Sequence, residues 1–317
     1  MQWKIARSGA FSEKLNRWAI DRGFPLLAWL APRAPRWFLF FGARATMAVV
    51  FFFHSQPLLA IGRNLARVLE KPADSREVRR AVREMLCHFA YYWVDLFRFA
   101  QLPPERLRSL IVGGDLASID PLRRLRDAGE RILLLTAHLG NWELGAVMLG
   151  GAELPLSVVY VRDEFEQAER FRSLLRGRAD VQEIPIRPDD RFASLPVLRA
   201  FAERRLVALQ GDRDFNEAHL EIELFGAPTR LPTGPFQLAR MTRARLQPVF
   251  IAYADDHRFE VALEPLIDVG QTDDRDADIR TAMETWARVL ERNIRRWPTQ
   301  WYNFHDVWPG GPGEDES

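Results

Sequence analysis

The chain is poor in several features that would each define a class of protein. It has one cysteine, Cys87, among 317 residues, which excludes an internal disulfide framework and a zinc cluster built on cysteines. Its 44 basic and 43 acidic residues nearly cancel, which argues against nucleic acid as a partner. It has no repeat period, so coiled coil and collagen are excluded. What remains is 47% apolar, enough to fill the core of one large α/β domain or two ordinary ones.

The chain also lacks an apolar run of the roughly 20 residues that a membrane-spanning helix needs. Large aromatic and aliphatic side chains crowd residues 24–54, but Arg33, Arg36 and Arg44 interrupt them. The segment has no compact apolar run followed by a cleavage site, as a signal peptide would have. It is typical of one or two helices that lie in the membrane interface, with aromatics in the lipid and arginines at the headgroups. A soluble helical core rich in aromatics is the alternative.

Hydrophobic periodicity separates a helical first third from an alternating remainder. Further helices are expected over 56–68 and 75–99, ending before Pro103-Pro104. Beyond them we expect strands over 131–137, 157–161, 206–210, 247–253 and 258–266, and helices over 141–149, 164–178, 191–204, 233–242 and 274–297. This alternation predicts an α/β fold with a mixed, mostly parallel sheet flanked by helices. The predicted organisation is a helical membrane-interface region (1–112), an α/β domain (113–310) and a disordered tail (311–317).

The turn after the first strand carries the strongest chemical signal. It reads His138-Leu-Gly-Asn-Trp-Glu143. On one regular helix, residues five apart point about 140° away from each other, so His138 must lie on the loop and Glu143 in the first helical turn. Gly140 can make the turn and Asn141 can cap the helix. A carboxylate against an imidazole gives a general base, here without a neighbouring serine or cysteine nucleophile. The alternative is a capping glutamate beside a structural histidine.

This motif resembles the H-x4-D/E signature of the glycerolipid acyltransferase superfamily, and more closely the late acyltransferases of lipid A biosynthesis, whose motif is His-Phe-Gly-Asn-Trp-Glu. Later segments resemble that family in order. They are Val159-Tyr160 leading to Arg176, the D-x-D step Asp212-Arg-Asp214, the block Phe225-Gly226-Ala-Pro228 with Pro232-Thr-Gly234-Pro235, and Trp297-Pro298-Thr-Gln300-Trp301 ahead of His305. The ordered matches run from about Gly129 to Trp308, behind a helical membrane-hook region such as the family has.

The resemblance implies an enzyme of the bacterial inner membrane, peripheral or monotopic at its cytoplasmic face. It moves a fatty acyl chain from an acyl carrier protein or CoA thioester to a hydroxyl of a lipid A precursor or related glycolipid. His138 deprotonates that hydroxyl and Glu143 orients and charge-stabilises His138. No acyl-enzyme, metal or cofactor is implied.

The resemblance also suggests substrate-binding residues. The guanidinium of Arg176 could clamp a substrate phosphate, unless it is one more solvated helix arginine. Asp212 and Asp214 follow a strand end, where a carboxylate could pair with Arg213, hold Arg176, or simply be solvated. Asn141 and Gly234 complete the set, with Gly234 shaping the start of a helix near the acyl chain.

The sequence departs from the lipid A enzymes near its end. Asp306-Val307-Trp308 stands where those enzymes usually carry arginines, and Thr299 replaces the motif glutamate. The loss of cations leaves open another glycolipid, or a polyene-type lipid, as acceptor. Three other functions remain as alternatives: a glycerophospholipid acyltransferase, an acyl hydrolase, and a non-enzymatic membrane-binding protein.

Overall fold

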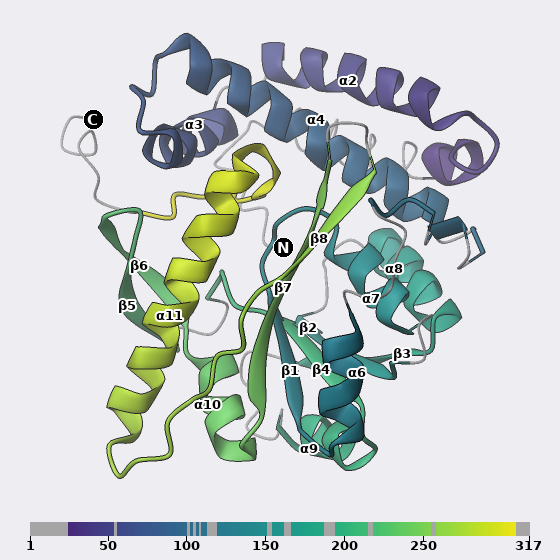
Figure 1. Ribbon diagram of the computed structural model, residues 1–317. Helices are drawn as coiled ribbons and strands as arrows, with labels where there is room; N and C mark the ends of the chain where they lie inside the picture. The colour runs from purple at the N-terminus through teal and green to yellow at the C-terminus, as the bar shows by residue number, and fades with distance from the viewer. Residues whose placement is uncertain are drawn as a thin grey trace.

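Six strands form one sheet at the centre of the molecule (Figure 1). The computed structural model describes residues 25–53, 56–99, 102–103, 106–107, 109–112, 119–150, 154–161, 166–186, 194–214, 218–254 and 258–308. The disordered tail predicted for 311–317 lies outside these ranges. The sheet consists of β1 (Ile132–Thr136), β2 (Leu156–Val161), β3 (Val181–Ile186), β4 (Leu206–Gln210), β7 (Arg245–Tyr253) and β8 (Phe259–Leu263).

The strand order is β3-β2-β4-β1-β7-β8. The first five strands in this order run parallel, and β8 is antiparallel to β7. The predicted mixed, mostly parallel sheet is therefore confirmed. Because β1 and β4 are parallel neighbours, the loops that follow them leave the same edge of the sheet. This edge is where open α/β sheets bind ligands.

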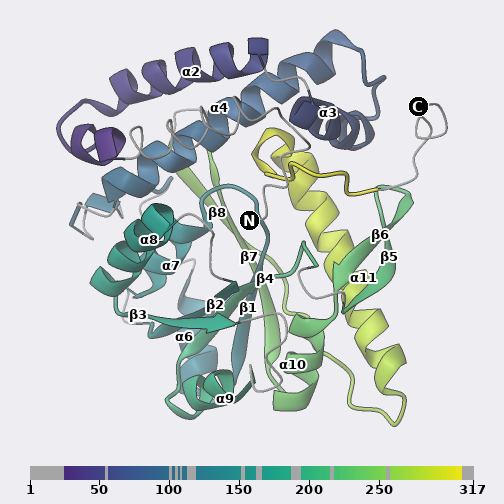
Figure 2. The same cartoon turned by 180° about the vertical axis from the view of Figure 1, so that it is seen from behind.

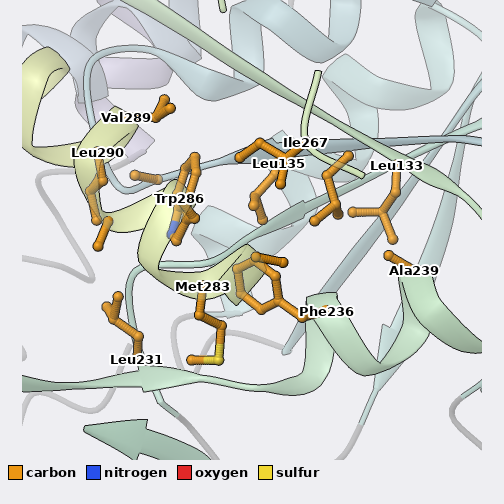
Figure 3. Close-up of a cluster of buried hydrophobic side chains, with 14 of the residues drawn as sticks. Leu133, Leu135, Leu231, Phe236, Ala239, Ile267, Met283, Trp286, Val289 and Leu290 are labelled. Atoms are coloured by element: carbon orange, nitrogen blue, oxygen red, sulfur yellow. The ribbon is translucent and has the colours of Figure 1, made fainter. Parts of the chain in front are cut away.

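Helices cover both faces of the sheet and complete two cores. One face carries α9 (Ser194–Ala202), α10 (Gly234–Thr242) and α11 (Arg275–Arg296); the other carries α6 (Asp120–Asp127), α7 (Trp142–Gly150) and α8 (Glu166–Arg178). Leu133 and Leu135 of β1 pack with Trp286 and Phe236 in the first core (Figure 3). Ile132 and Leu134 belong to the second core, so the first four residues of β1 are all apolar rather than alternating.

Two strands that the sequence analysis did not predict form a separate hairpin. β5 (His219–Leu224) and β6 (Ala227–Pro232) pair antiparallel, and Leu224 and Ala227 are partners. The two residues between them, Phe225 and Gly226, both have positive φ, as a two-residue hairpin turn requires. The Phe-Gly of the family-like block is thus a turn. Strand β3, at one edge of the six-stranded sheet, was not predicted either.

Three helices from the first third lie beyond the sheet: α2 (Arg36–Phe53), α3 (Gln56–Leu69) and α4 (Arg76–Phe99). Figures 1 and 2 show α4 crossing above the strands with α2 on its outer side. The guanidinium of Arg36 binds both carboxylate oxygens of Asp95 on α4, at 2.9 and 2.5 Å. The hydroxyl of Tyr253 on β7 donates to the same carboxylate at 2.8 Å. This buried contact fixes α2 to the α/β domain.

Aromatic side chains on α2 and in the helical turn before it remain exposed. Trp37 and Phe41 are 71% and 70% exposed, and Trp29 is 57% exposed. Arg33 lies over the ring of Trp29, 4.9 Å from its centroid. In the part of the chain that the structure describes, no helix is both long enough and apolar enough to cross a membrane.

Candidate active site

The turn from β1 into α7 is held by backbone contacts to two other segments. The N–H of Gly140 donates to the carbonyl of Gln300 at 2.9 Å, and the N–H of Asn141 donates to the carbonyl of Ile251 at 2.7 Å. Gly140 has φ of 67°, and a Cβ there would lie 1.9 Å from the Ile251 carbonyl oxygen. Only glycine fits this position. The side chain of Asn141 accepts from the N–H of Leu144 at 3.0 Å, so the predicted N-cap is confirmed.

The imidazole of His138 is held by Asp212. Its Nδ1 lies 2.8 Å from Oδ1 of Asp212, and the backbone N–H of His138 donates to Oδ2 at 3.1 Å. The indole N–H of Trp301 donates to the same Oδ2 at 3.1 Å. A carboxylate only accepts hydrogen bonds, so Nδ1 carries the proton and Nε2 carries the lone pair. This is the tautomer that a general base needs.

The environment keeps the imidazole neutral and the carboxylate ionised. Burial lowers the pKa of His138, the charge of Arg213 lowers it further, and Asp212 raises it, with a balance at about 4. Burial acts to raise the pKa of Asp212, but the hydrogen bonds and charge of His138, together with Arg213, bring it to about 2. Near pH 7 the pair is therefore a neutral base on an ionised carboxylate.

The expectation that Glu143 orients the imidazole is corrected by this geometry. Glu143 does lie in the first turn of α7, as predicted, but its carboxylate binds Arg176. The Nε and Nη2 of Arg176 donate to its two oxygens at 2.9 and 2.6 Å. Both side chains are buried, at 3% and 4% exposed. The partner of His138 comes instead from β4, because its carboxyl end lies beside that of β1.

Arg176 is not arranged as a phosphate clamp. Besides binding Glu143, it donates through Nη1 to Glu183 at 3.0 Å, and its guanidinium lies over the ring of Tyr160. The fork that the sequence analysis assigned to a substrate phosphate therefore binds two carboxylates of the protein itself. Buried arginine–carboxylate pairs of this kind hold neighbouring elements together, here α7, α8 and β3.

Of the remaining predicted site residues, Asp212 binds the imidazole of His138, whereas Asp214 and Gly234 make other contacts. Asp214 binds the imidazole of His219 at 2.6 Å, so the two aspartates of the D-x-D step have different partners. Asp212, predicted to bind substrate, instead binds His138. Gly234 begins α10, as expected of a helix start, but α10 packs in the core on the other face of the sheet from the cavity described below.

The segment after α11, with the short helix η2 (Pro298–Gln300), makes hydrogen bonds to the histidine turn and to β7 beside it. The side chain of Gln300 accepts from the N–H of Tyr253 and donates to the carbonyl of Tyr253, at 2.8 and 2.9 Å. The N–H of Tyr302 donates to the carbonyl of His138 at 2.8 Å. Arg213 donates to the carbonyl of Tyr302. This segment is one of the motifs that resemble the family, and its contacts with the histidine turn are not evident from the sequence.

Two cavities at the site share part of their lining. A pocket beside His138 is also lined by Tyr92, Arg172, Arg213 and Tyr302. The second cavity is apolar and reaches between the sheet and α7; its lining includes Leu134, Met148, Val158, Ala208, Val249 and Val261. Glu143, Tyr160, Arg176 and Gln210 are among the residues that line both cavities. The pocket of His138 therefore adjoins an apolar space of a kind that suits an acyl chain.

Comparison with known proteins identifies the family of the chain. A family model described as bacterial lipid A biosynthesis acyltransferase matches residues 13–309. The chain belongs to this family, and it is an acyltransferase. The resemblance predicted from the motifs is confirmed.

Curated relatives share most of their length with this chain. A phosphatidylinositol mannoside acyltransferase of Mycolicibacterium smegmatis is 29% identical over 247 residues, which cover 78% of each chain. A protein of the same name from Mycobacterium tuberculosis strain H37Rv is 27% identical over 302 residues, 92% of this chain and 88% of the relative. The acceptor in these names is a glycolipid other than lipid A.

Proposed function

We propose that the protein transfers a fatty acyl chain from an acyl carrier protein or CoA thioester to a hydroxyl of a mannosylated phosphoinositide or a closely related glycolipid. The observation that carries the proposal is the His138–Asp212 pair, whose imidazole lines a pocket that shares residues with the apolar cavity. A neutral imidazole with its lone pair on Nε2 is a general base, and the cavity offers room for an acyl chain beside it.

The proposed chemistry is direct transfer. The acceptor oxygen attacks the thioester carbonyl carbon while its proton passes to Nε2 of His138. The tetrahedral intermediate then collapses, the carbon–sulfur bond breaks, and the thiolate leaves with that proton. Asp212 stabilises the imidazolium that forms between these steps. Since no acyl-enzyme is formed, the kinetics are sequential.

The choice of acceptor rests on charge and on the relatives. Asp306, at the position where the lipid A enzymes usually have arginine, forms an ion pair with Arg63 at 2.5 Å. The local charge is thus balanced rather than positive, which favours a headgroup with less phosphate than a lipid A precursor. The named acceptor of the relatives, phosphatidylinositol mannoside, has that character.

The exposed aromatics support attachment to the membrane surface. Trp29, Trp37 and Phe41 project from the N-terminal helices, and Arg33 and Arg44 are exposed beside them. Aromatics flanked by arginines suit the boundary between headgroups and acyl chains. Because CoA and acyl-carrier thioesters are made in the cytoplasm, we propose peripheral binding at the cytoplasmic face of the bacterial inner membrane.

An acyl-transfer assay with mass spectrometry tests the proposal. The full chain is incubated with palmitoyl-CoA, or with palmitoyl acyl carrier protein, and vesicles that contain phosphatidylinositol dimannoside. We expect a product heavier than the acceptor by one acyl chain, and a loss of about 10²- to 10⁴-fold in rate for His138→Ala. Free palmitate without acceptor indicates a hydrolase, and acylation of glycerol phosphate instead indicates a glycerophospholipid acyltransferase. Undiminished transfer by purified His138→Ala overturns the assignment of the base.

A further inference from the structure

Gln210 lies two residues before Asp212 in the chain. It is the last residue of β4 and is directly opposite Thr136 of β1. Two residues further along each strand direction stand Asp212 and His138, which bind each other. His138 and Asp212 follow the ends of β1 and β4, and His138 and Gln210 line the same pocket. The side chain of Gln210 therefore borders the pocket that holds the base.

The amide of Gln210 is an unexplained donor at the junction of the two cavities. Gln210 lines both the pocket that holds His138 and the apolar cavity. Its Nε2 is buried and has no hydrogen-bond partner among the residues that the structure describes. Buried amides are rarely left unpaired, because the lost hydrogen bond to water is not replaced. A donor of this kind, in this place, is suited to a substrate atom.

Arg176, the neighbouring cation at the junction, is committed elsewhere. It donates to both oxygens of Glu143 and to Glu183. A thioester with its chain in the apolar cavity and its carbonyl carbon beside His138 can direct its carbonyl oxygen toward this junction. Of the residues that line both cavities, Gln210 has a buried amide N–H without a partner in the described part of the chain; the hydroxyls of Tyr92 and Tyr302 in the pocket of His138 are unpaired there as well.

We propose that Nε2 of Gln210 donates a hydrogen bond to the thioester carbonyl oxygen and stabilises the oxyanion of the tetrahedral intermediate. This inference rests on the proposed acyl transfer and adds a catalytic residue to it. As the acceptor oxygen bonds to the carbonyl carbon, the C=O π electron pair moves onto the oxygen, and the Gln210 amide faces that negative charge. When the intermediate collapses, the pair returns and the thiolate leaves. Donors fixed before the reaction stabilise such charge more than mobile water does.

Gln210→Met tests the inference in the full chain with palmitoyl-CoA and phosphatidylinositol dimannoside. Methionine matches glutamine in length but has no N–H. We expect kcat to fall about 10²- to 10³-fold, as for loss of one oxyanion donor, with KM for palmitoyl-CoA within about threefold. The melting temperature should stay the same or rise, since an unpaired buried amide has been removed. Gln210→Glu, which keeps the shape and places an acceptor against the oxyanion, should lose at least as much.

Gln247→Met is the matched control. Gln247 is a buried glutamine of the same sheet, on β7, which β1 separates from β4, and its Nε2 donates to the carbonyls of Pro248 and Glu264. This variant should lose melting temperature and keep kcat, the opposite of Gln210→Met.

The outcomes separate the inference from the function it rests on. A wild-type protein that transfers no acyl chain from either thioester overturns the proposed function. The role of Gln210 alone is overturned if the wild type is active, His138→Ala is inactive, and Gln210→Met keeps a kcat within threefold of wild type. A raised KM with unchanged kcat also overturns it, because the amide then binds ground state and transition state equally. If Gln210→Met does not fold, Gln210→Asn, whose amide is too short to reach, decides by the same criterion.

Discussion

Replacing Asp212 with asparagine should place the histidine proton on the wrong nitrogen. In the wild type, Oδ1 faces the Nδ1–H of His138, and Oδ2 accepts from the His138 N–H and the Trp301 indole. Asparagine has one oxygen for three donors. If its oxygen stays with the two donors, its NH2 group faces Nδ1, which must then accept, and the proton moves to Nε2. The base is thereby blocked.

The opposite orientation of the amide preserves the tautomer but is costly. It turns NH2 toward the His138 N–H and the Trp301 indole and leaves two buried donors without partners. At about 1–3 kcal/mol for each donor, this orientation lies roughly 2–6 kcal/mol higher. Because 1.4 kcal/mol corresponds to a factor of ten, the competent tautomer falls to between about 1 in 30 and 1 in 10⁴. We therefore expect kcat/KM of Asp212→Asn to fall by about 30- to 10⁴-fold.

Two measurements check this reasoning together. Steady-state acyl transfer gives kcat/KM, and nitrogen NMR of histidine-labelled protein reports which ring nitrogen carries the proton. A value of kcat/KM within tenfold of wild type, or a protonated Nδ1 in the variant, refutes the argument. Asp278→Asn is the control, because Asp278 is also buried but stands in the first turn of α11, about 27 Å along the helix from the end that leads to η2 and the histidine turn. It should lose stability and keep turnover.

Glu143→Gln distinguishes the geometry from the expectation based on sequence. If Glu143 oriented the imidazole, this variant would change the histidine tautomer. Because Glu143 instead binds Arg176, we expect the tautomer to be unchanged and the free energy of unfolding to fall by about 3–5 kcal/mol, as when one partner of a buried ion pair is removed. Chemical denaturation measures that loss. A wild-type unfolding midpoint contradicts the expected role.

Three more predictions concern pH, strain and the membrane. With the pKa of His138 at about 4, the acid limb of the kcat/KM profile should lie near pH 4, and a limb near pH 6.5 contradicts this. The free energy of unfolding should decrease as the pH is lowered from 6.5 to 4, because the unfolded histidine takes up a proton in this range and the folded one does not. Gly140→Ala should lose at least about 2 kcal/mol of stability and most activity, since its Cβ meets the Ile251 carbonyl; wild-type melting and turnover contradict this. Replacing Trp37 and Phe41 with serine should weaken binding to anionic vesicles about 100-fold in a sedimentation assay, since each exposed aromatic contributes about 1.5 kcal/mol. Turnover on detergent-dispersed acceptor should be retained, and unchanged sedimentation refutes the prediction.

Local signals in the sequence predicted the parts of the fold that local physics determines. The run Ile132–Leu135 is apolar throughout because each face of β1 enters a different core, and a continuous run shows this without knowledge of the partners. The cap at Asn141 depends only on the next three residues. By contrast, β3 contains Pro185 and polar residues, which an edge strand tolerates because one side forms no ladder. Its sequence therefore lacks the signal of a buried strand.

The error over Glu143 has a physical cause of the same kind. Sequence reasoning sought the partner of His138 within one turn of chain, where the spacing allowed Glu143. The actual partner, Asp212, is 74 residues away and reaches the imidazole because β4 pairs with β1 in register. The available signal was that each residue follows a strand end by the same two positions. Reading it required the strand order, which composition and periodicity do not give.

The same long-range logic connects the exposed helix to the histidine turn. Arg36 on α2 binds Asp95, and Asp95 accepts from the hydroxyl of Tyr253 at the end of β7. The backbone of Tyr253 binds the side chain of Gln300, and the carbonyl of Gln300 accepts from the N–H of Gly140. Every link is a short contact between buried or half-buried groups, so α2 and the turn share one frame. Under the proposed function, lipid contact at α2 therefore fixes the direction in which the mouth of the site faces the bilayer, and an acceptor still embedded in the membrane can bring its hydroxyl to the base.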